Sequence, residues 1–347
     1  MKTLDKEKRR PDQLHKLFIR NTDLIEKFGT TYALNNQVDV IRKLAPVVSE
    51  QDIKIFSGNA VKILSECNPL LDVSKSERLQ MQLYELDKMT YSPEVRRGTT
   101  ITLAAIVNHL EWFSSCDSNT MRTAVNKALR EIFKNANNWK WWGSVGELLP
   151  TRAEANPTLF LESVEGLLKG DGQIIRQMME QASDQWIGNS DPLLYIRNSL
   201  SILAWEPQFF ARSLHCLYDM AGYDIDVNGH NRSIDSMVGI LLPLHPHTYE
   251  TVKRRHKILE NLLLSSDDNA LMLFRELLPR VTSIASMGRK PEWIHASSNE
   301  QFIDLNSDYE FYAEHYVKLA LRAADTTLAA IKDIGRSEHT SELQSRI

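Results

Sequence analysis

The segment from Asp224 to Gly229 has residue types and a spacing that could bind calcium. Its oxygen-bearing residues at the first, third, fifth and twelfth positions are Asp224, Asp226, Asn228 and Asp235. An EF-hand loop surrounds calcium with oxygens at these positions, and its glycine permits the sharp turn. Three features depart from that pattern: Asp235 is shorter than the usual glutamate, Asn231 replaces an aliphatic residue, and Arg232 adds a positive charge. A polar turn between two helices accounts for the same residues, because Asp and Asn side chains bond to turn backbone.

A basic run, Lys253-Arg254-Arg255-His256-Lys257, falls within a stretch whose apolar residues repeat with helical spacing. Most such runs are the solvated face of a helix, but a basic run can also contact a phosphate or an acidic partner. The candidate interaction surface therefore consists of Lys253, Arg254, Arg255 and Lys257.

Three tryptophans, Trp139, Trp141 and Trp142, lie beside Lys140. Aromatic residues interleaved with basic ones can stack on nucleic-acid bases. In stacked helices, however, large aromatic side chains more often fill the space between successive helices. The packing interpretation is therefore favoured over the nucleic-acid one.

A proline separates His245 from His247, and two further metal-binding side chains, His215 and Cys216, lie upstream. A metal site is one interpretation of this group. Two histidines one residue apart do not share a helix face, and no second pair at ligand spacing supports them. We predict instead that this segment begins a helix over Tyr249–Leu264 and that no metal is bound.

The chain carries no recognised catalytic signature. A P-loop, a G-x-S-x-G motif, an H-E-x-x-H motif and the kinase motifs do not occur in the sequence.

The net charge of −4 is small for 347 residues and argues against a chain devoted to nucleic acid. The three cysteines lie far apart, and no apolar run approaches the roughly 18 residues that span a bilayer. We therefore expect a cytoplasmic, non-enzymatic protein that needs no cofactor and no membrane.

Apolar residues recur three and four positions apart along almost the whole chain, which is the spacing of an amphipathic helix. The clearest stripes run over Ile53–Leu64, Leu103–Phe113, Val125–Phe133, Phe160–Leu168, Phe210–Ala221 and Tyr312–Ala330. Alternating patterns typical of strands are nearly absent, so the sequence predicts an all-α fold with no sheet. Loops are expected over Tyr223–Ser233 and Thr282–Asp308, where turn-forming residues gather.

Two of the predicted helix starts resemble each other. One reads Asn156-Pro157-Thr-Leu-Phe160 and the other Glu206-Pro207-Gln-Phe-Phe210. Short helices, proline turns and a loose repeat are typical of stacked helical hairpins, as in a HEAT-like α-solenoid. An irregular globular helical domain is the alternative architecture.

From about Trp142 to Ala330, several segments occur in the order found in a known protein family. They are Glu147-Leu-Leu-Pro150, Ala155-Asn-Pro-Thr-Leu-Phe160-Leu-Glu, Leu203-Ala-Trp-Glu-Pro207, Asn231-Arg-Ser-Ile-Asp-Ser236, Leu241-Leu-Pro-Leu-His-Pro-His-Thr248 and Arg289-Lys-Pro-Glu-Trp293. On these segments the chain resembles the C-terminal helical region of large bacterial STAND-type NTPases, a class that includes anti-phage defence proteins. In that family the loop at Asp226 is usually a plain turn, which favours the turn interpretation over calcium.

The resemblance implies that an NTPase and an effector domain lie N-terminal to this region in the whole protein. The expected domains are an N-terminal helical array over 1–140, the family-like helical repeat region over 141–335, and a tail over 336–347. The tail is similar to a translated sequencing adapter and is expected to be artefactual. The expected function is a sensor or scaffold that recognises a protein trigger or packs on the NTPase. A general protein–protein interaction scaffold and a nucleic-acid-binding helical repeat are the alternatives.

Overall fold

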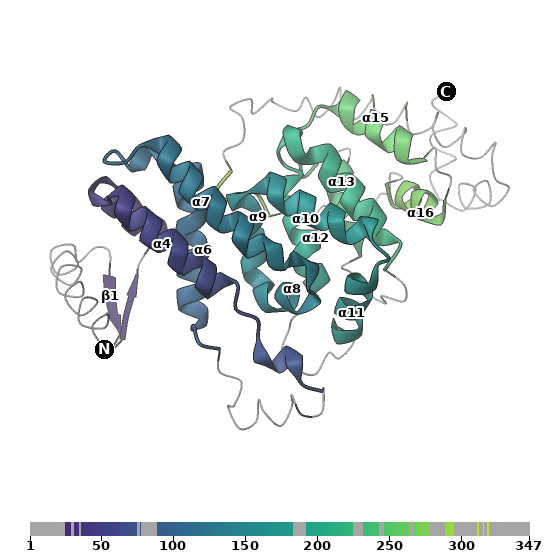
Figure 1. Ribbon diagram of the computed structural model, residues 1–347. Helices are drawn as coiled ribbons and strands as arrows, with labels where there is room; N and C mark the ends of the chain where they lie inside the picture. Colours follow the sequence, from purple (N-terminus) through teal and green to yellow (C-terminus); the bar gives the residue numbers. More distant parts are fainter. Residues whose placement is uncertain are drawn as a thin grey trace. The chain divides into compact units, whose positions relative to one another are not determined.

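A computed structural model shows how the chain folds, and Figure 1 gives its course. It describes residues 25–28, 31–34, 36–74, 77, 89–182, 192–224, 232–242, 246–263, 267–277, 289–294, 311, 315 and 318. By packing, the chain divides into two compact units. The first unit takes residues 1–64 and 91–129, and the second takes residues 65–90 and 130–347.

The described part of the first unit is mainly a small group of packed helices. These are α3 (Gln37–Leu44), α4 (Glu50–Leu64), α6 (Pro93–Asn108) and most of α7 (Ser118–Phe133), with 3₁₀ turns η2 (Ala45–Val47) and η4 (Leu110–Trp112). Helix α4 packs on α6, and both bury their apolar stripes, with Ile53, Ala60 and Leu103 almost fully enclosed. The predicted helices over Ile53–Leu64 and Val125–Phe133 are therefore confirmed.

A two-stranded antiparallel sheet precedes these helices. Strand β1 (Ile25–Phe28) pairs with β2 (Thr31–Leu34), so that Ile25 lies opposite Leu34 and Phe28 opposite Thr31. The expectation of no sheet thus needs a correction at this one place. A hairpin of four-residue strands is too short for the alternating pattern to stand out against the helical spacing around it. Elsewhere the described residues are all helix or loop, and the all-α class holds.

The second unit is a stack of short helices, most of which lie side by side in the centre of Figure 1. Its helices are α8 (Trp139–Val145), α9 (Leu149–Ala155), α10 (Pro157–Lys169), α11 (Gln173–Ala182), α12 (Pro192–Leu203), α13 (Pro207–Ala221), α14 (Ser233–Leu241), α15 (Val252–Leu263) and α16 (Asp268–Leu277). The 3₁₀ turn η6 (Gly146–Leu148) joins α8 to α9, η5 (Lys134–Asn137) precedes α8, and η3 (Pro69–Asp72) belongs to the earlier part of this unit. Among the helices that the structure describes, none has both the length and the apolar character of a membrane span.

Prolines begin several of these helices, as the sequence indicated. Pro157, Pro192 and Pro207 are each the first residue of a helix, where a missing N–H costs nothing and φ is already helical. Asn156 caps α10 by accepting a hydrogen bond from the Leu159 N–H at 3.0 Å. The prolines therefore mark the positions at which these helices begin.

The two similar helix starts belong to two similar pairs of helices. Helix α9 packs on α12, and α10 packs on α13, so the pair α9–α10 stacks on the pair α12–α13. Phe160 and Phe210, at equivalent places after the two prolines, are both fully buried. This arrangement is consistent with the predicted stack of helical hairpins.

Some predicted boundaries differ from those in the structure. Helix α6 ends at Asn108, so the last residues of the Leu103–Phe113 stripe lie in a 3₁₀ turn and a loop. The packing boundary between the two units falls at 129/130, within α7. The predicted stripe over Tyr312–Ala330 lies almost wholly outside the described residues.

Gly172 provides a test of the packing between the start of α11 and the end of α13. Its φ is +71°, and a Cβ there would lie 2.5 Å from the Tyr223 hydroxyl oxygen. We expect Gly172→Ala to lower the free energy of unfolding by about 1–3 kcal/mol, because both the backbone and the ring must shift. Urea unfolding followed by circular dichroism measures this change.

Gly166→Ala is the matched control, because nothing lies within 4 Å of a Cβ added in that helix. It should raise the free energy of unfolding by about 0.5–1 kcal/mol, since alanine favours a helix over glycine. Equal effects of the two substitutions would contradict the described contact of Gly172 with Tyr223.

Candidate interaction site

Asp224, the first calcium candidate, is engaged by protein groups instead. Its Oδ1 pairs with Nη2 of Arg197 at 2.7 Å, and its Oδ2 accepts the Ser233 N–H at 2.6 Å. The Arg197 Nε–H also donates to the Ser233 hydroxyl at 3.2 Å. Both charged side chains are almost fully buried, at 4% and 7% exposure. The three residues therefore tie α12, the end of α13 and the start of α14 together.

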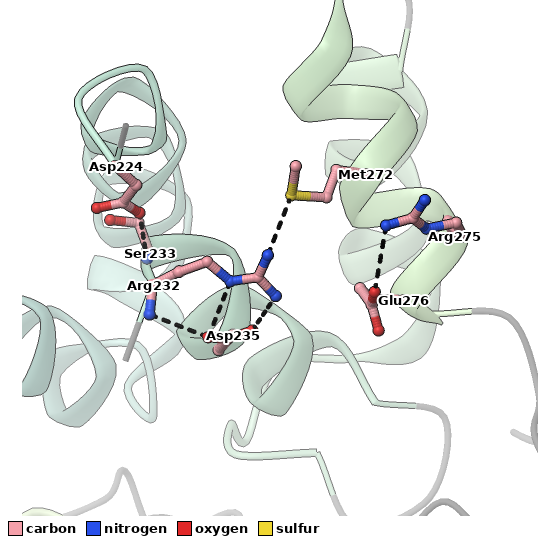
Figure 2. A network of polar contacts seen from close by, with 7 residues as sticks. All are labelled: Asp224, Arg232, Ser233, Asp235, Met272, Arg275 and Glu276. Atoms are coloured by element: carbon pink, nitrogen blue, oxygen red, sulfur yellow. Dashed lines mark hydrogen bonds and ion pairs between the residues drawn. The ribbon is translucent and has the colours of Figure 1, made fainter. Parts of the chain in front are cut away.

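Asp235, the last calcium candidate, caps the start of α14 (Figure 2). Its Oδ2 accepts the backbone N–H of Arg232 at 2.9 Å, and its Oδ1 pairs with the guanidinium of the same residue at 2.8 Å. A third contact reaches from the Arg232 Nη1 to the Met272 sulfur on α16 at 3.6 Å. Asp224 and Asp235 thus serve the helix–helix turn, which was the simpler interpretation.

The other two calcium candidates, Asp226 and Asn228, lie outside the described residues. Within the part of the chain that the structure describes, no three His, Cys, Asp or Glu side chains are grouped to hold a metal ion. His247, from the proposed metal group, is used in packing: its backbone N–H donates to the Gly239 carbonyl, and its ring stacks on Trp205. Burial raises the pKa of the Cys216 thiol to about 12, so this residue is a neutral thiol.

Only part of the basic run lies on the surface. Lys253, Arg254 and Lys257 are exposed, whereas Arg255 is fully buried and donates from Nη1 to the Leu242 carbonyl at 3.2 Å. Arg255 must therefore be removed from the candidate interaction surface. The physical reason is the helical turn of about 100° per residue, which places Arg255 on the inner face of α15.

His256 is also on the inner face of α15. Its ring centroid lies 4.9 Å from that of His315 and 5.4 Å from that of Phe311. Burial, reinforced by the nearby His315, lowers the pKa of His256 to about 4. The imidazole is therefore neutral at neutral pH, and the exposed part of the run carries fewer charges than its sequence suggests.

The predicted start of the α15 helix also needs a correction. The helix begins at Val252, not at Tyr249, because the preceding residues form a turn of their own. In this turn the Thr248 hydroxyl accepts the Glu250 N–H, and the Glu250 carboxylate accepts the Thr251 N–H. Glu250 also pairs with Arg254 at 3.2 Å, which uses one of the three exposed cations.

Two of the three tryptophans are packing residues, and Trp139 is half-buried. Trp141 and Trp142 are fully buried, with ring centroids 5.1 Å apart in an edge-to-face arrangement. The Trp142 indole N–H donates to the Ala136 carbonyl at 2.7 Å, and the guanidinium of the buried Arg152 lies 5.7 Å from the Trp141 ring centroid. These two rings cannot stack on bases, and this removes the main support for nucleic-acid binding.

A contact that the sequence did not predict joins α9 to the segment Arg289–Ile294, which we call the strap. Glu154 is 2% exposed, and its Oε2 accepts three consecutive backbone N–H groups of the strap. The N···O distances are 2.8 Å from Glu292, 2.6 Å from Trp293 and 3.2 Å from Ile294. Burial raises the pKa of Glu154, while the three hydrogen bonds act in the opposite direction.

The other end of the strap lies on Trp205, in the turn between α12 and α13. The Trp205 indole N–H donates to the Arg289 carbonyl at 3.0 Å. The ammonium of Lys290 lies 5.3 Å from the Trp205 ring centroid and 5.9 Å from that of Tyr249. Trp293 is itself buried at 4% exposure. The strap is therefore held at both ends and by one enclosed aromatic side chain.

Sequence reasoning could not locate this contact because the strap uses mainly its backbone. Glu154 is a single carboxylate in a short helix, and its partners lie more than a hundred residues away. The segment Arg289-Lys-Pro-Glu-Trp293 drew notice only through the family resemblance. The one local signal was a glutamate between two apolar residues, Ala153 and Ala155, because a carboxylate in an apolar helix face needs partners there.

Comparison with known proteins identifies no relative. No family model, no curated protein and no solved structure matches the chain.

The burial of Arg255 predicts very different effects for two cations of the same run. Arg255→Ala should lower the free energy of unfolding by about 2–4 kcal/mol, because it leaves a cavity and removes the donor to Leu242. Lys257→Ala is the matched control on the exposed face and should change it by less than about 0.5 kcal/mol. Chemical denaturation of both variants measures the difference, and equal small effects would place Arg255 back on the surface.

The low pKa of His256 predicts that acid destabilises the fold. Between pH 6.5 and about 4 the unfolded chain binds a proton at this residue that the folded chain does not. The free energy of unfolding should therefore fall as the pH drops through this window. His256 should account for up to about 2 kcal/mol of the fall. Denaturation midpoints at pH 7 and pH 4.5 test this. His256→Gln should weaken the pH dependence, whereas His215→Gln, at an exposed position, should leave it as it is.

Proposed function

We propose that the chain is a non-catalytic helical interaction module of a larger, cytoplasmic STAND-type NTPase. In this proposal the module recognises a protein trigger or packs against the NTPase domain of its own protein. The support from sequence is the ordered series of segments from Glu147 to Trp293 that resembles this class. A module of this kind needs no cofactor, metal or membrane.

The observation that carries the proposal is the stacking of two equivalent helix pairs. The pair α9–α10 lies on the pair α12–α13, because α9 packs on α12 and α10 packs on α13. Stacked pairs produce extended surfaces to which many residues contribute weakly. Recognition of a protein along such a surface fits a chain without a sharp motif.

The buried charges of the second unit also support a non-catalytic role. Glu154 holds three backbone N–H groups, and Asp224 holds Arg197 and the start of α14. Each carboxylate is thus used to satisfy other groups of the fold, not held ready for proton transfer. Binding of a trigger would act by favouring one arrangement of the helix pairs over another.

A general protein–protein interaction scaffold is the second candidate, because stacked helix pairs serve that role in many unrelated proteins. A nucleic-acid-binding repeat is disfavoured by the burial of Trp141, Trp142 and Arg255. Of the three exposed cations of α15, Lys253 and Lys257 remain available to an acidic protein partner, because Arg254 is paired with Glu250.

The proposal is tested by sequencing the source gene upstream of Met1 and by a binding assay. We expect the reading frame to continue into a strand–P-loop–helix sequence, and the encoded NTPase region to co-purify with this chain. A charge-reversed variant, Lys253→Glu with Lys257→Glu, tests whether α15 contributes to binding of the NTPase region. Lys127→Glu, on α7, is the control. A stop codon in frame shortly before Met1 would contradict the STAND assignment and leave the scaffold.

A further inference from the structure

The strap is bound in the way that proteins bind short peptides. Four of its contacts use backbone atoms: three N–H groups donate to Glu154, and the Arg289 carbonyl accepts from Trp205. One side chain, that of Trp293, is enclosed. Backbone hydrogen bonds that give affinity, together with one aromatic anchor, are the usual pattern of peptide recognition.

The receiving surface is assembled from three separate parts of the second unit. Glu154 comes from α9, Trp205 follows α12, and Tyr249 precedes α15. The Trp205 carbonyl accepts the Tyr249 N–H at 2.9 Å, and the two rings lie 5.1 Å apart. Trp205 and Tyr249 therefore hold each other in place independently of the strap.

The strap is suited to be a ligand of this surface. Pro291 has no N–H and fixes its own φ, so the series of donors begins at Glu292. Three consecutive N–H groups that converge on one oxygen form a small anion-binding nest. The charged side chains of Arg289 and Glu292 pair with each other at 2.7 Å and stay exposed. Their contacts do not compete with those that the backbone makes.

We propose that Glu154, Trp205 and Tyr249 form a peptide-binding site that the chain's own strap, Arg289–Ile294, occupies as an exchangeable ligand. The strap leaves and rebinds this site while the helices beneath it stay folded. The ligand class is a peptide with a tryptophan anchor and a run of free N–H groups that a bend in its backbone brings together. This inference goes beyond the proposed function and does not rest on it.

Hydrogen exchange on the full chain tests the exchange of the strap without any substitution. The amides of Glu292, Trp293 and Ile294 should exchange by local opening, at least about tenfold faster than the central amides of α9 and α12. Exchange of the strap and the helices at one common rate would overturn the proposal, because the strap would then open only when the whole unit unfolds.

Glu154→Ala adds a second readout in the same experiment. Loss of the acceptor should speed exchange of the strap amides by a further 10–100-fold or so, and change the α12 amides by less than about threefold. Glu162→Ala, which removes an exposed glutamate of α10, is the matched control and should change neither. A uniform acceleration of the strap and α12 in Glu154→Ala would argue against a separable strap.

Binding in trans tests the site itself. A fluorescein-labelled peptide of residues 286–297 should bind Trp293→Ala at least about tenfold more tightly than the wild type, whose own strap competes at high effective concentration. Adding Glu154→Ala, or replacing the peptide's tryptophan by alanine, should abolish this binding. Circular dichroism verifies that each variant is folded. A folded Trp293→Ala chain that does not bind the peptide would overturn the proposed site.

Discussion

The second unit depends on the packing of helices that are too short to stand alone. They run from seven residues in α8 and α9 to fifteen in α13, whereas isolated helices below about 12–15 residues are marginal in water. Each helix is therefore stable only against its neighbours, and its ends leave backbone groups that the interior must satisfy. Buried charged side chains meet that demand. Glu154 satisfies three N–H groups of the strap, and Asp224 satisfies the start of α14 together with Arg197.

The features that the sequence predicted well are those encoded locally. Apolar spacing located α4, α10 and α13, and prolines marked the first residues of α10, α12 and α13. The burial of Trp141 and Trp142 agrees with the predicted packing role, since large rings between stacked helices are usually enclosed. The burial of Arg255 also has a local signal in the sequence. Arg255 shares a helix face with Leu259 and Leu262, and that spacing indicates an inward residue despite its charge.

The features that the sequence did not predict arise from contacts between distant residues or from very short elements. No spacing rule connects Glu154 to Trp293, because the hydrogen bonds run to backbone groups that every residue except proline possesses. The hairpin of β1 and β2 has too few residues for strand alternation to be distinguished from noise. The start of α15 was misplaced for a related reason: Thr248, Glu250 and Thr251 bond among themselves and delay the helix.

The contact between Glu154 and the strap also shows how a stack of this kind can change state. A buried carboxylate is costly when it is desolvated, as the raised pKa of Glu154 reflects, and each of the three N–H groups offsets part of that cost. With the strap away, the carboxylate and the N–H groups would return to water, so no intermediate arrangement is favoured. A partner that binds the chain better with the strap bound, or better with the strap released, would shift the balance between these two states.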